Sequence, residues 1–340
     1  MKILFNTYIH AFQNPGGGET VLLKTKEALE KKGITVDLFD QWKMKISDYD
    51  IMHDFSSINW RYWESFKGCG VKLAVTPVQW PNDSFPKPIE EKTKSIIKNV
   101  LGYSSPEVNI WNAMRIPDIF FPTTQMEMDK ILNYYELPKN TKYKVIYNGI
   151  DSPTKIDLEE NSFFKKFQIN DYLLYVGRIS PLKNVEFIIE SALATNSKLV
   201  LVGTADITDA EYAKKLKEKY QHKVIFVGAL PSQSKILTDA YKGAKALIVA
   251  SFFETCSLVG LEAGSLGIPV IMTEAGATKE IYQNHVQYIN PYQKETLISA
   301  IKNISSIGIK DYSLQKYILD NFSWDKVADA LITSYLDLLR

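Results

Sequence analysis

Residues 251–270 read SFFETCSLVGLEAGSLGIPV, and the second half of the chain can be arranged around this stretch. It follows the apolar run 246–250, which is typical of a buried parallel strand, and it leads into a second apolar run at 270–272. Small and apolar residues between the two runs predict a helix that ends before Gly267-Ile268-Pro269. The order of strand, loop, helix and strand indicates a parallel α/β sheet.

Two carboxylates stand in this stretch, Glu254 in the loop and Glu262 in the predicted helix. Acidic side chains are rarely buried without a partner, so Glu262, between Leu261 and Ala263, needs one. Ligands of open α/β sheets lie at the carboxyl ends of the strands. We therefore expect the loop and the helix to hold a polar, hydroxyl-rich ligand.

Short apolar runs continue the alternation of strand and helix along the chain. Strands are expected at 1–7, 36–39, 50–54, 71–75, 116–121 and 144–147, and then at 172–176, 198–202 and 223–227. A polar segment at 152–170 is the expected linker. Two doubly wound domains that face a cleft are predicted, residues 1–150 and 151–324. The last helix, 325–340, is amphipathic and is expected to dock on another part of the chain.

Composition indicates a soluble globular protein. The length of 340 residues suggests two domains, and a net charge of +1 gives no reason to expect binding to nucleic acid. Cys69 and Cys256 are far apart and make neither a metal-binding spacing nor a disulfide framework, which favours the cytoplasm. The first apolar run is too short for a signal sequence, and no run has the length of a membrane span.

The lysine-rich segment 87–101 is a candidate for peripheral contact with anionic lipid at the inner face of a membrane. Glu90 and Glu91 weaken this interpretation and favour an ordinary solvated helix face.

Several motifs, in their order and spacing, resemble those of a known family. They are PGGGE at 15–19, YNGID at 147–151, YVGRISPLKN at 175–184, LVLVG at 199–203, VIFVGAL at 224–230, EAGATKEIY at 274–282 and FSWDKVADAL at 322–331. Together with the two glutamates, which seven residues separate, they resemble the retaining glycosyltransferases of family 4, which have the two-Rossmann GT-B fold. The resemblance covers nearly the whole chain. It implies that the last helix returns to the N-terminal domain.

The family's donor is a nucleotide diphosphate sugar, here expected to carry UDP. Gly177, Arg178 and Lys183 would meet its phosphates at the end of a strand. The loop of Gly16, Gly17 and Gly18, from the other domain, would let backbone approach the donor because no Cβ intrudes. The alternative for Arg178 and Lys183 is that they are surface charges near a helix start.

The resemblance also implies roles for the two carboxylates. Glu262 would accept hydrogen bonds from the ribose hydroxyls, and Glu254 would bind a hydroxyl of the donor sugar. The amides of Cys256, Ser257 and Leu258 would face the diphosphate or the sugar, and Gly228 to Leu230 would pack against the base. The alternatives are an exposed loop acid for Glu254, a lysine-paired helix acid for Glu262 and a plain turn at 228–230.

The chain departs from the family at one place in this motif. The family commonly has Glu-Gly-Phe-Gly-Leu, whereas this chain has ETCSL at 254–258. The loss of both glycines restricts the backbone and adds side chains near the expected sugar, which bears on the identity of the donor more than on activity.

Three residues of the first half are candidates for the reacting end of the site. His53 follows an expected strand, where the family often places a histidine that hydrogen-bonds the reacting sugar; a structural histidine is the alternative. Gln79 and Trp80 are candidates for lining an acceptor pocket.

The expected reaction is transfer of a sugar, with retention, from the donor to a glycan, lipid-linked or protein-linked acceptor. The leaving phosphate would help to deprotonate the acceptor, while His53, Glu254, Arg178 and Lys183 position and stabilise the charges. No metal-ligand cluster is visible in the sequence, so neither a metal nor another cofactor is expected. The alternatives are a non-catalytic partner subunit and a nucleotide-sugar epimerase. A dehydrogenase is disfavoured because PGGGE lacks the G-x-G-x-x-G spacing.

Overall fold

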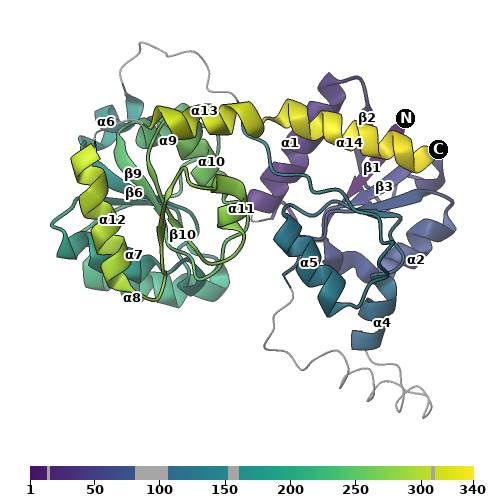
Figure 1. The fold of residues 1–340 in the computed structure, drawn as a ribbon, viewed down its shortest axis with the longest axis horizontal. Helices are drawn as coiled ribbons and strands as arrows, with labels where there is room; N and C mark the ends of the chain where they lie inside the picture. The colour runs from purple at the N-terminus through teal and green to yellow at the C-terminus, as the bar shows by residue number, and fades with distance from the viewer. Residues whose placement is uncertain (14–15, 81–105, 152–160, 308–310) are drawn as a thin grey trace. The chain divides into compact units, whose positions relative to one another are not determined.

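The computed structural model describes residues 1–13, 16–80, 106–151, 161–307 and 311–340. The chain forms two compact units (Figure 1). The N-terminal unit comprises Met1–Gly149 and Trp324–Arg340, and the C-terminal unit comprises Ile150–Ser323. The boundaries predicted from the sequence, after residue 150 and before residue 325, each differ by one residue from this division.

The N-terminal unit contains a parallel sheet of five strands in the order β2-β1-β3-β4-β5. The strands are β1 (Lys2–Asn6), β2 (Thr35–Leu38), β3 (Ile51–Asp54), β4 (Lys72–Val75) and β5 (Ile119–Phe120). Its helices are α1 (Gly17–Lys31), α2 (Trp60–Gly68), α4 (Pro106–Ala113), α5 (Gln125–Tyr134) and α14 (Trp324–Leu339), with short 3₁₀ turns η1 (Ile46–Asp48) and η2 (Ser57–Asn59).

Successive side chains of these strands face opposite layers of helices, as the period of a strand requires. Ile3 and Phe5 pack with α1 and α14, whereas Leu4 packs on the other face with residues of α2 and α5. In Figure 1 the yellow helix α14 lies beside the purple helix α1. Its buried face includes Val327, Leu331, Tyr335 and Leu338, so the predicted docking of the last helix on the N-terminal unit is confirmed.

The C-terminal unit contains a parallel sheet of six strands in the order β11-β10-β9-β6-β7-β8. The strands are β6 (Tyr172–Val176), β7 (Leu199–Val202), β8 (Ile225–Gly228), β9 (Ala244–Val249), β10 (Val270–Thr273) and β11 (Gln287–Ile289). Its helices are α6 (Ser162–Phe167), α7 (Val185–Ala194), α8 (Ala210–Tyr220), α9 (Lys235–Lys242), α10 (Leu258–Ser265), α11 (Thr278–Tyr282), α12 (Lys294–Ile307) and α13 (Tyr312–Asn321), with 3₁₀ turns η3 (Pro181–Lys183) and η4 (Ile207–Asp209).

Helices cover both faces of this sheet too. Residues of α6, α9, α10, α11 and α13 share a core with one face, and residues of α7, α8 and α12 share a core with the other. Each unit is therefore doubly wound, as predicted. The chain passes from β6 to β7 on one side and later returns to place β9 on the other side of β6. The loops that leave β6 and β9 thus diverge, and this is the point of an open α/β sheet where ligands bind.

Two local predictions are wrong. Residues 144–147 are not a strand: the segment runs beside β5, with the amide of Lys144 donating to the carbonyl of Phe120 at 2.9 Å, but β5 is only two residues long and no ladder forms. The expected linker at 152–170 contains helix α6, because Phe163 is buried against Tyr172.

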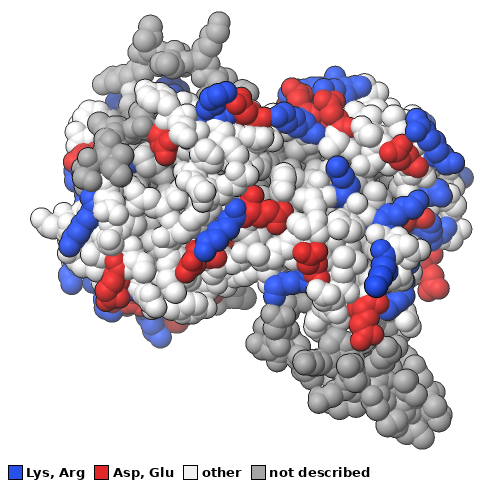
Figure 2. Space-filling model, viewed as in Figure 1, with Lys and Arg blue, Asp and Glu red and all other residues white. Residues whose placement is uncertain are grey.

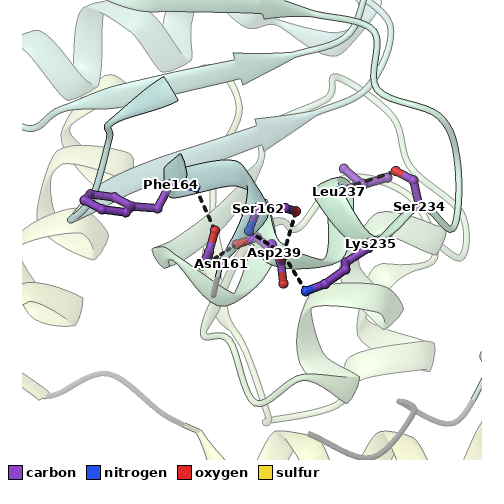
Figure 3. A network of polar contacts seen from close by, with 7 residues as sticks. All are labelled: Asn161, Ser162, Phe164, Ser234, Lys235, Leu237 and Asp239. Atoms are coloured by element: carbon purple, nitrogen blue, oxygen red, sulfur yellow. Dashed lines mark hydrogen bonds and ion pairs between the residues drawn. The ribbon is translucent and has the colours of Figure 1, made fainter. Parts of the chain in front are cut away.

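A buried carboxylate fastens α6 to α9 (Figure 3). Asp239 accepts hydrogen bonds from the amide and the hydroxyl of Ser162, at 2.8 and 2.7 Å. It also forms an ion pair with Lys235 at 3.2 Å. Asn161 caps α6 through the amide of Phe164 and donates to the carbonyl of Asp239. Burial would raise the pKa of Asp239, but these donors outweigh burial and the pKa is lowered.

The surface carries mixed charges. On the face shown in Figure 2, acidic and basic side chains are interspersed among the described residues. No helix within the described ranges is both long and apolar enough to span a membrane. The segment 87–101, singled out for lipid contact, lies outside the described residues.

Candidate functional site

Two predicted site residues of the C-terminal unit, Lys183 and Glu254, meet where the loops after β6 and β9 begin to diverge. The amide of Phe252, after β9, donates to the carbonyl of Leu182, after β6, at 3.0 Å. Beside this link, the ammonium of Lys183 lies 2.8 Å from Oε2 of Glu254. The structure thus brings one predicted phosphate ligand and the predicted sugar ligand into direct contact.

The position of Glu254 is held at both its backbone and its side chain. Its amide donates to the carbonyl of Ala275 at 3.2 Å, and its carbonyl accepts from the amide of Ala277 at 2.9 Å. Ser251, which is buried, donates to the same carboxylate oxygen as Lys183, at 3.2 Å. Gly276 makes the approach possible, since a Cβ there would lie 1.9 Å from the Glu254 carbonyl oxygen. The carboxylate is therefore preorganised.

Arg178 is paired with a residue that the sequence reasoning did not single out. Its guanidinium forms a hydrogen-bonded ion pair with Asp206, on the loop after β7. The side chain of Arg178 is 56% exposed and that of Lys183 is 29% exposed, so solvent and ligands can reach both cations.

Helix α10 begins immediately after the loop that carries Glu254. The carbonyls of Cys256 and Ser257 both accept from the buried hydroxyl of Tyr282, at 3.0 and 2.7 Å. Gly260 leaves room for this hydroxyl, since a Cβ there would lie 2.4 Å from it. These contacts orient the turn that contains the amides of Cys256, Ser257 and Leu258.

Ser257 occupies a backbone conformation that suits glycine. Its φ is +47°, in the left-handed region, and its hydroxyl oxygen is buried with no hydrogen-bond partner in the part of the chain that the structure describes. This is one of the two positions where the family commonly has glycine, and the conformation supplies the physical reason. At the other position, Thr255, the backbone does not have a positive φ.

Glu262 has a phenol as its partner. Tyr241, on α9, donates to Oε2 of Glu262 at 2.6 Å; among the described residues no lysine pairs with this carboxylate. Burial raises the pKa of Glu262, the hydrogen bond from Tyr241 opposes the shift, and the charge of Asp151 adds to it. Tyr241 thus supplies part of the hydrogen bonding that the Glu262 carboxylate needs in its apolar helix.

Three glycines lie side by side at the carboxyl ends of β6, β7 and β8. The amide of Gly203 donates to the carbonyl of Gly228 at 2.8 Å, and a Cβ on Gly203 would lie 1.8 Å from the carbonyl oxygen of Gly177. Leu230 is partly buried against the core of the unit. Close backbone packing with Gly203 therefore accounts for glycine at positions 177 and 228, in addition to the predicted contact with the donor.

The glycine loop of the N-terminal unit opens helix α1. Gly16, Gly17 and Gly18 are exposed, and a Cβ at Gly18 would meet no atom within 4 Å. Glu19 is buried and its Oε2 accepts from the amide of Gly16 at 2.8 Å, which satisfies the amide of the residue before α1. Pro15 of this motif lies outside the described residues.

His53 lies in the core of the N-terminal unit. It is 1% exposed, its Nδ1 pairs with the hydroxyl of Tyr335 at 2.6 Å, and its Nε2 pairs with that of Thr76 at 2.9 Å. Burial lowers the pKa of its imidazole to about 3, so it is neutral at pH 7. The cavity that it lines has a volume of about 20 Å³, room for roughly one water molecule. The catalytic role of His53 stays a prediction, and here the residue links α14 to the sheet.

Gln79 and Trp80 follow β4. The amide of Gln79 donates to Glu127 at 3.1 Å and its side chain donates to the hydroxyl of Tyr135, while Lys130 lies 5.0 Å from the centre of the Trp80 ring. Both residues are partly exposed, and their role in binding an acceptor stays a prediction.

Within the described residues, no three His, Cys, Asp or Glu side chains are grouped so that they could hold a metal ion. The independence from metal stays a prediction.

The sequence reasoning missed four residues that shape this site: Ser251, Asp206, Tyr241 and Tyr282. Tyr241 is 21 residues from Glu262 and Asp206 is 28 residues from Arg178, so no local pattern names these partners. Ser251 and Tyr282 do lie in stretches that the sequence singles out, 251–270 and EAGATKEIY.

Known proteins share parts of this sequence. Residues 170–306 match the family described as glycosyl transferases group 1. The chain is 27% identical to the uncharacterized glycosyltransferase MJ1607 of Methanocaldococcus jannaschii over 225 residues, which are 61% of this chain and 57% of that protein. It is 28% identical to the O-antigen chain mannosyltransferase RfbU of Salmonella typhimurium over 185 residues, 53% of this chain and 48% of that protein. The chain thus spans about half the length of the curated relatives it matches.

Solved structures share the fold over nearly the whole chain. A sucrose-phosphate synthase from Thermosynechococcus elongatus has a TM-score of 0.77 at 16% identity and covers 99% of both chains. Anabaena Alr3699/HepE, solved in complex with UDP, has a TM-score of 0.74 at 16% identity and covers 99% of this chain and 100% of its own. The predicted α/β two-domain GT-B fold is confirmed.

Proposed function

We propose that the protein is a glycosyltransferase that moves a sugar, with retention of configuration and without a metal, from a UDP-sugar to a glycan, lipid-linked or protein-linked acceptor. The observation that carries the proposal is the meeting of Lys183 and Glu254 at the divergence of the loops after β6 and β9. A cation for phosphate and a carboxylate for sugar hydroxyls stand there within one ligand's reach. The family matched by residues 170–306 and the UDP bound to a structural neighbour support it.

Each residue has a task that its environment suits. Lys183 and Arg178 bind the diphosphate and stabilise the charge that grows on it as the sugar leaves. Glu262, whose Oε2 is held by Tyr241, accepts from the ribose hydroxyls. Glu254 binds a hydroxyl of the sugar, with the amides of 256–258 beside it.

The transfer step places few demands on side-chain chemistry. The donor's β-phosphate oxygen takes the proton from the acceptor hydroxyl as the new glycosidic bond forms on the face from which UDP leaves. The protein contributes position and electrostatic stabilisation. His53 can join this step only if its bonds to Tyr335 and Thr76 open.

The first test is a calorimetric titration with UDP, after a thermal-shift screen of nucleotide sugars. We expect Arg178→Ala and Glu262→Gln each to weaken UDP by about 1.5–3 kcal/mol, the worth of a hydrogen bond to a charged group. Lys279→Ala is the control for Arg178, since it removes another exposed, ion-paired cation of the same unit. Parent-like affinity in Arg178→Ala and Lys183→Ala would refute the assignment of the diphosphate.

The second test separates the classes of function. A transferase releases free UDP only when an acceptor is present, and Glu254→Gln lowers this release. An epimerase converts the nucleotide sugar without an acceptor. Absence of any nucleotide binding to the parent would favour a non-catalytic subunit. This alternative stands because Ser257 has a left-handed backbone at a position where the family commonly has glycine.

A further inference from the structure

Both cations assigned to the diphosphate are already neutralised by carboxylates of the protein. Lys183 lies 2.8 Å from Oε2 of Glu254, and Arg178 is hydrogen-bonded to Asp206. The two carboxylates come from different loops, after β9 and after β7, and they approach the loop after β6 that carries both cations. The four side chains thus form two closed ion pairs.

A nucleoside diphosphate and a carboxylate offer the same chemistry to these cations, namely anionic oxygens that accept charge-assisted hydrogen bonds. Lys183 directs its ammonium at Glu254, and a phosphate oxygen bound there would bring more negative charge against that carboxylate. The two anions therefore compete for one cation. Ser251 donates to the same Glu254 oxygen as Lys183, so the carboxylate keeps a hydrogen bond if the lysine departs.

We infer that Glu254 and Asp206 act as stand-ins for the diphosphate, and that binding of the donor exchanges the carboxylates for phosphate oxygens on Lys183 and Arg178. This inference rests on the proposed function. The exchange has a consequence for sugar recognition, because Oε2 of Glu254, which Lys183 and Ser251 share, gains room to accept from a sugar hydroxyl once the diphosphate has taken Lys183. Recognition of the sugar is then coupled to recognition of the phosphates.

The exposures of the partners suit an exchange. Lys183 is 29% exposed and Glu254 is 13% exposed, so the pair is accessible yet partly shielded from solvent. Arg178 is 56% exposed, and its pair with Asp206 is the weaker of the two because water screens it more. Neutralising Glu254 should therefore have the larger effect on binding.

The test is a calorimetric titration of the full chain with UDP. Glu254→Gln and Asp206→Asn keep the shape of each side chain and remove its charge. We expect UDP to bind about three- to fivefold tighter to Glu254→Gln, and about 1.5- to twofold tighter to Asp206→Asn, from the range of partly exposed ion pairs. A merely structural role would leave the affinity unchanged or lower it.

Two controls separate exchange from a general loss of negative charge. Glu274→Gln removes a charge from an exposed carboxylate of the same unit that pairs with Lys279, and it should leave the affinity for UDP unchanged. In a Lys183→Met background, Glu254→Gln should give no gain, because no cation remains to be released.

The outcomes are distinct. No tightening in Glu254→Gln, an equal gain in Glu274→Gln, or a gain that persists in the Lys183→Met background would each overturn the inference and leave the proposed function standing. Failure of the parent to bind UDP would overturn the proposed function and the inference with it. If Glu254→Gln does not fold, tighter binding of UDP to Asp206→Asn supports the exchange through an independent residue.

Discussion

Replacing Gly276 by Ala tests whether close backbone packing sets the position of Glu254. The added Cβ would lie 1.9 Å from the Glu254 carbonyl oxygen and 2.9 Å from the Glu254 amide nitrogen, and Gly276 has a φ of +96°. To bring the Cβ out to 3.0 Å, the carbonyl must move by about 1.1 Å (3.0 − 1.9). The bond that this carbonyl accepts from Ala277, 2.9 Å long, would then break.

The expected effects follow from this displacement. A side chain at positive φ costs about 1 kcal/mol, and the overlap adds about 1–3 kcal/mol, so the free energy of unfolding should fall by roughly 2–4 kcal/mol. A shift of about 1 Å in a positioning residue costs on the order of a hundredfold in rate, so sugar transfer should fall by that factor. The affinity for UDP should change less, because Arg178 and Glu262 do not lie on the displaced segment.

The assay is urea unfolding followed by tryptophan fluorescence, together with acceptor-dependent release of UDP. Gly33→Ala is the matched control, since Gly33 has a φ of +81° and a Cβ there would meet nothing within 4 Å. It should lose only about 1 kcal/mol of stability and keep full transfer activity. Equal stability and activity in the two variants would refute the reasoning that packing at Gly276 positions Glu254.

Three more substitutions and one chemical treatment give further tests. Ser257→Gly should raise the free energy of unfolding by about 1 kcal/mol, because it relieves a left-handed serine with an unpaired buried hydroxyl, and a lower urea midpoint would contradict this. Tyr241→Phe should lower the free energy of unfolding by about 1.5–3 kcal/mol, because Glu262 loses a hydrogen bond. The same change raises the pKa of Glu262 further and should weaken UDP binding more at pH 5.5 than at pH 8. An equal loss of UDP affinity at both pH values would count against this reasoning. Burial raises the pKa of Asp54 to about 6 from an ordinary 3.8, so folding favours the protonated carboxyl. The free energy of unfolding should therefore fall by about 3 kcal/mol as the pH rises from 4 to 6. Asp54→Asn should lack this slope in urea unfolding at pH 4, 5 and 7. Removal of divalent metal with a chelator should leave UDP binding and transfer unchanged, and an activity restored by Mg²⁺ would disprove the independence from metal.

The alternation of strands and helices was predictable because it is written in local patterns. Apolar runs of three to seven residues mark the strands β1 to β10, and the amphipathic face of 325–340 marks a docking helix. The short edge strand β11 was not predicted. The segment 144–147 was mistaken for a strand because an apolar run does not reveal how long its neighbouring strand is. Helix α6 was missed because its short apolar cluster becomes meaningful only against Tyr172 and Asp239.

By itself the sequence determined the doubly wound architecture, the last helix's apolar face, and the places of Glu254 before α10 and Glu262 within it. Spacing and punctuation by glycine and proline act over a few residues, which is why they are readable from the sequence. Tertiary structure alone decided the partners. Lys183 meets Glu254 across 71 positions, and His53 is enclosed by Tyr335 across 282 positions. Such contacts depend on strand order and on which helix returns to which sheet. A pattern of neighbours along the chain does not contain that information, so the sequence could indicate a carboxylate in need of a partner but not which side chain would serve.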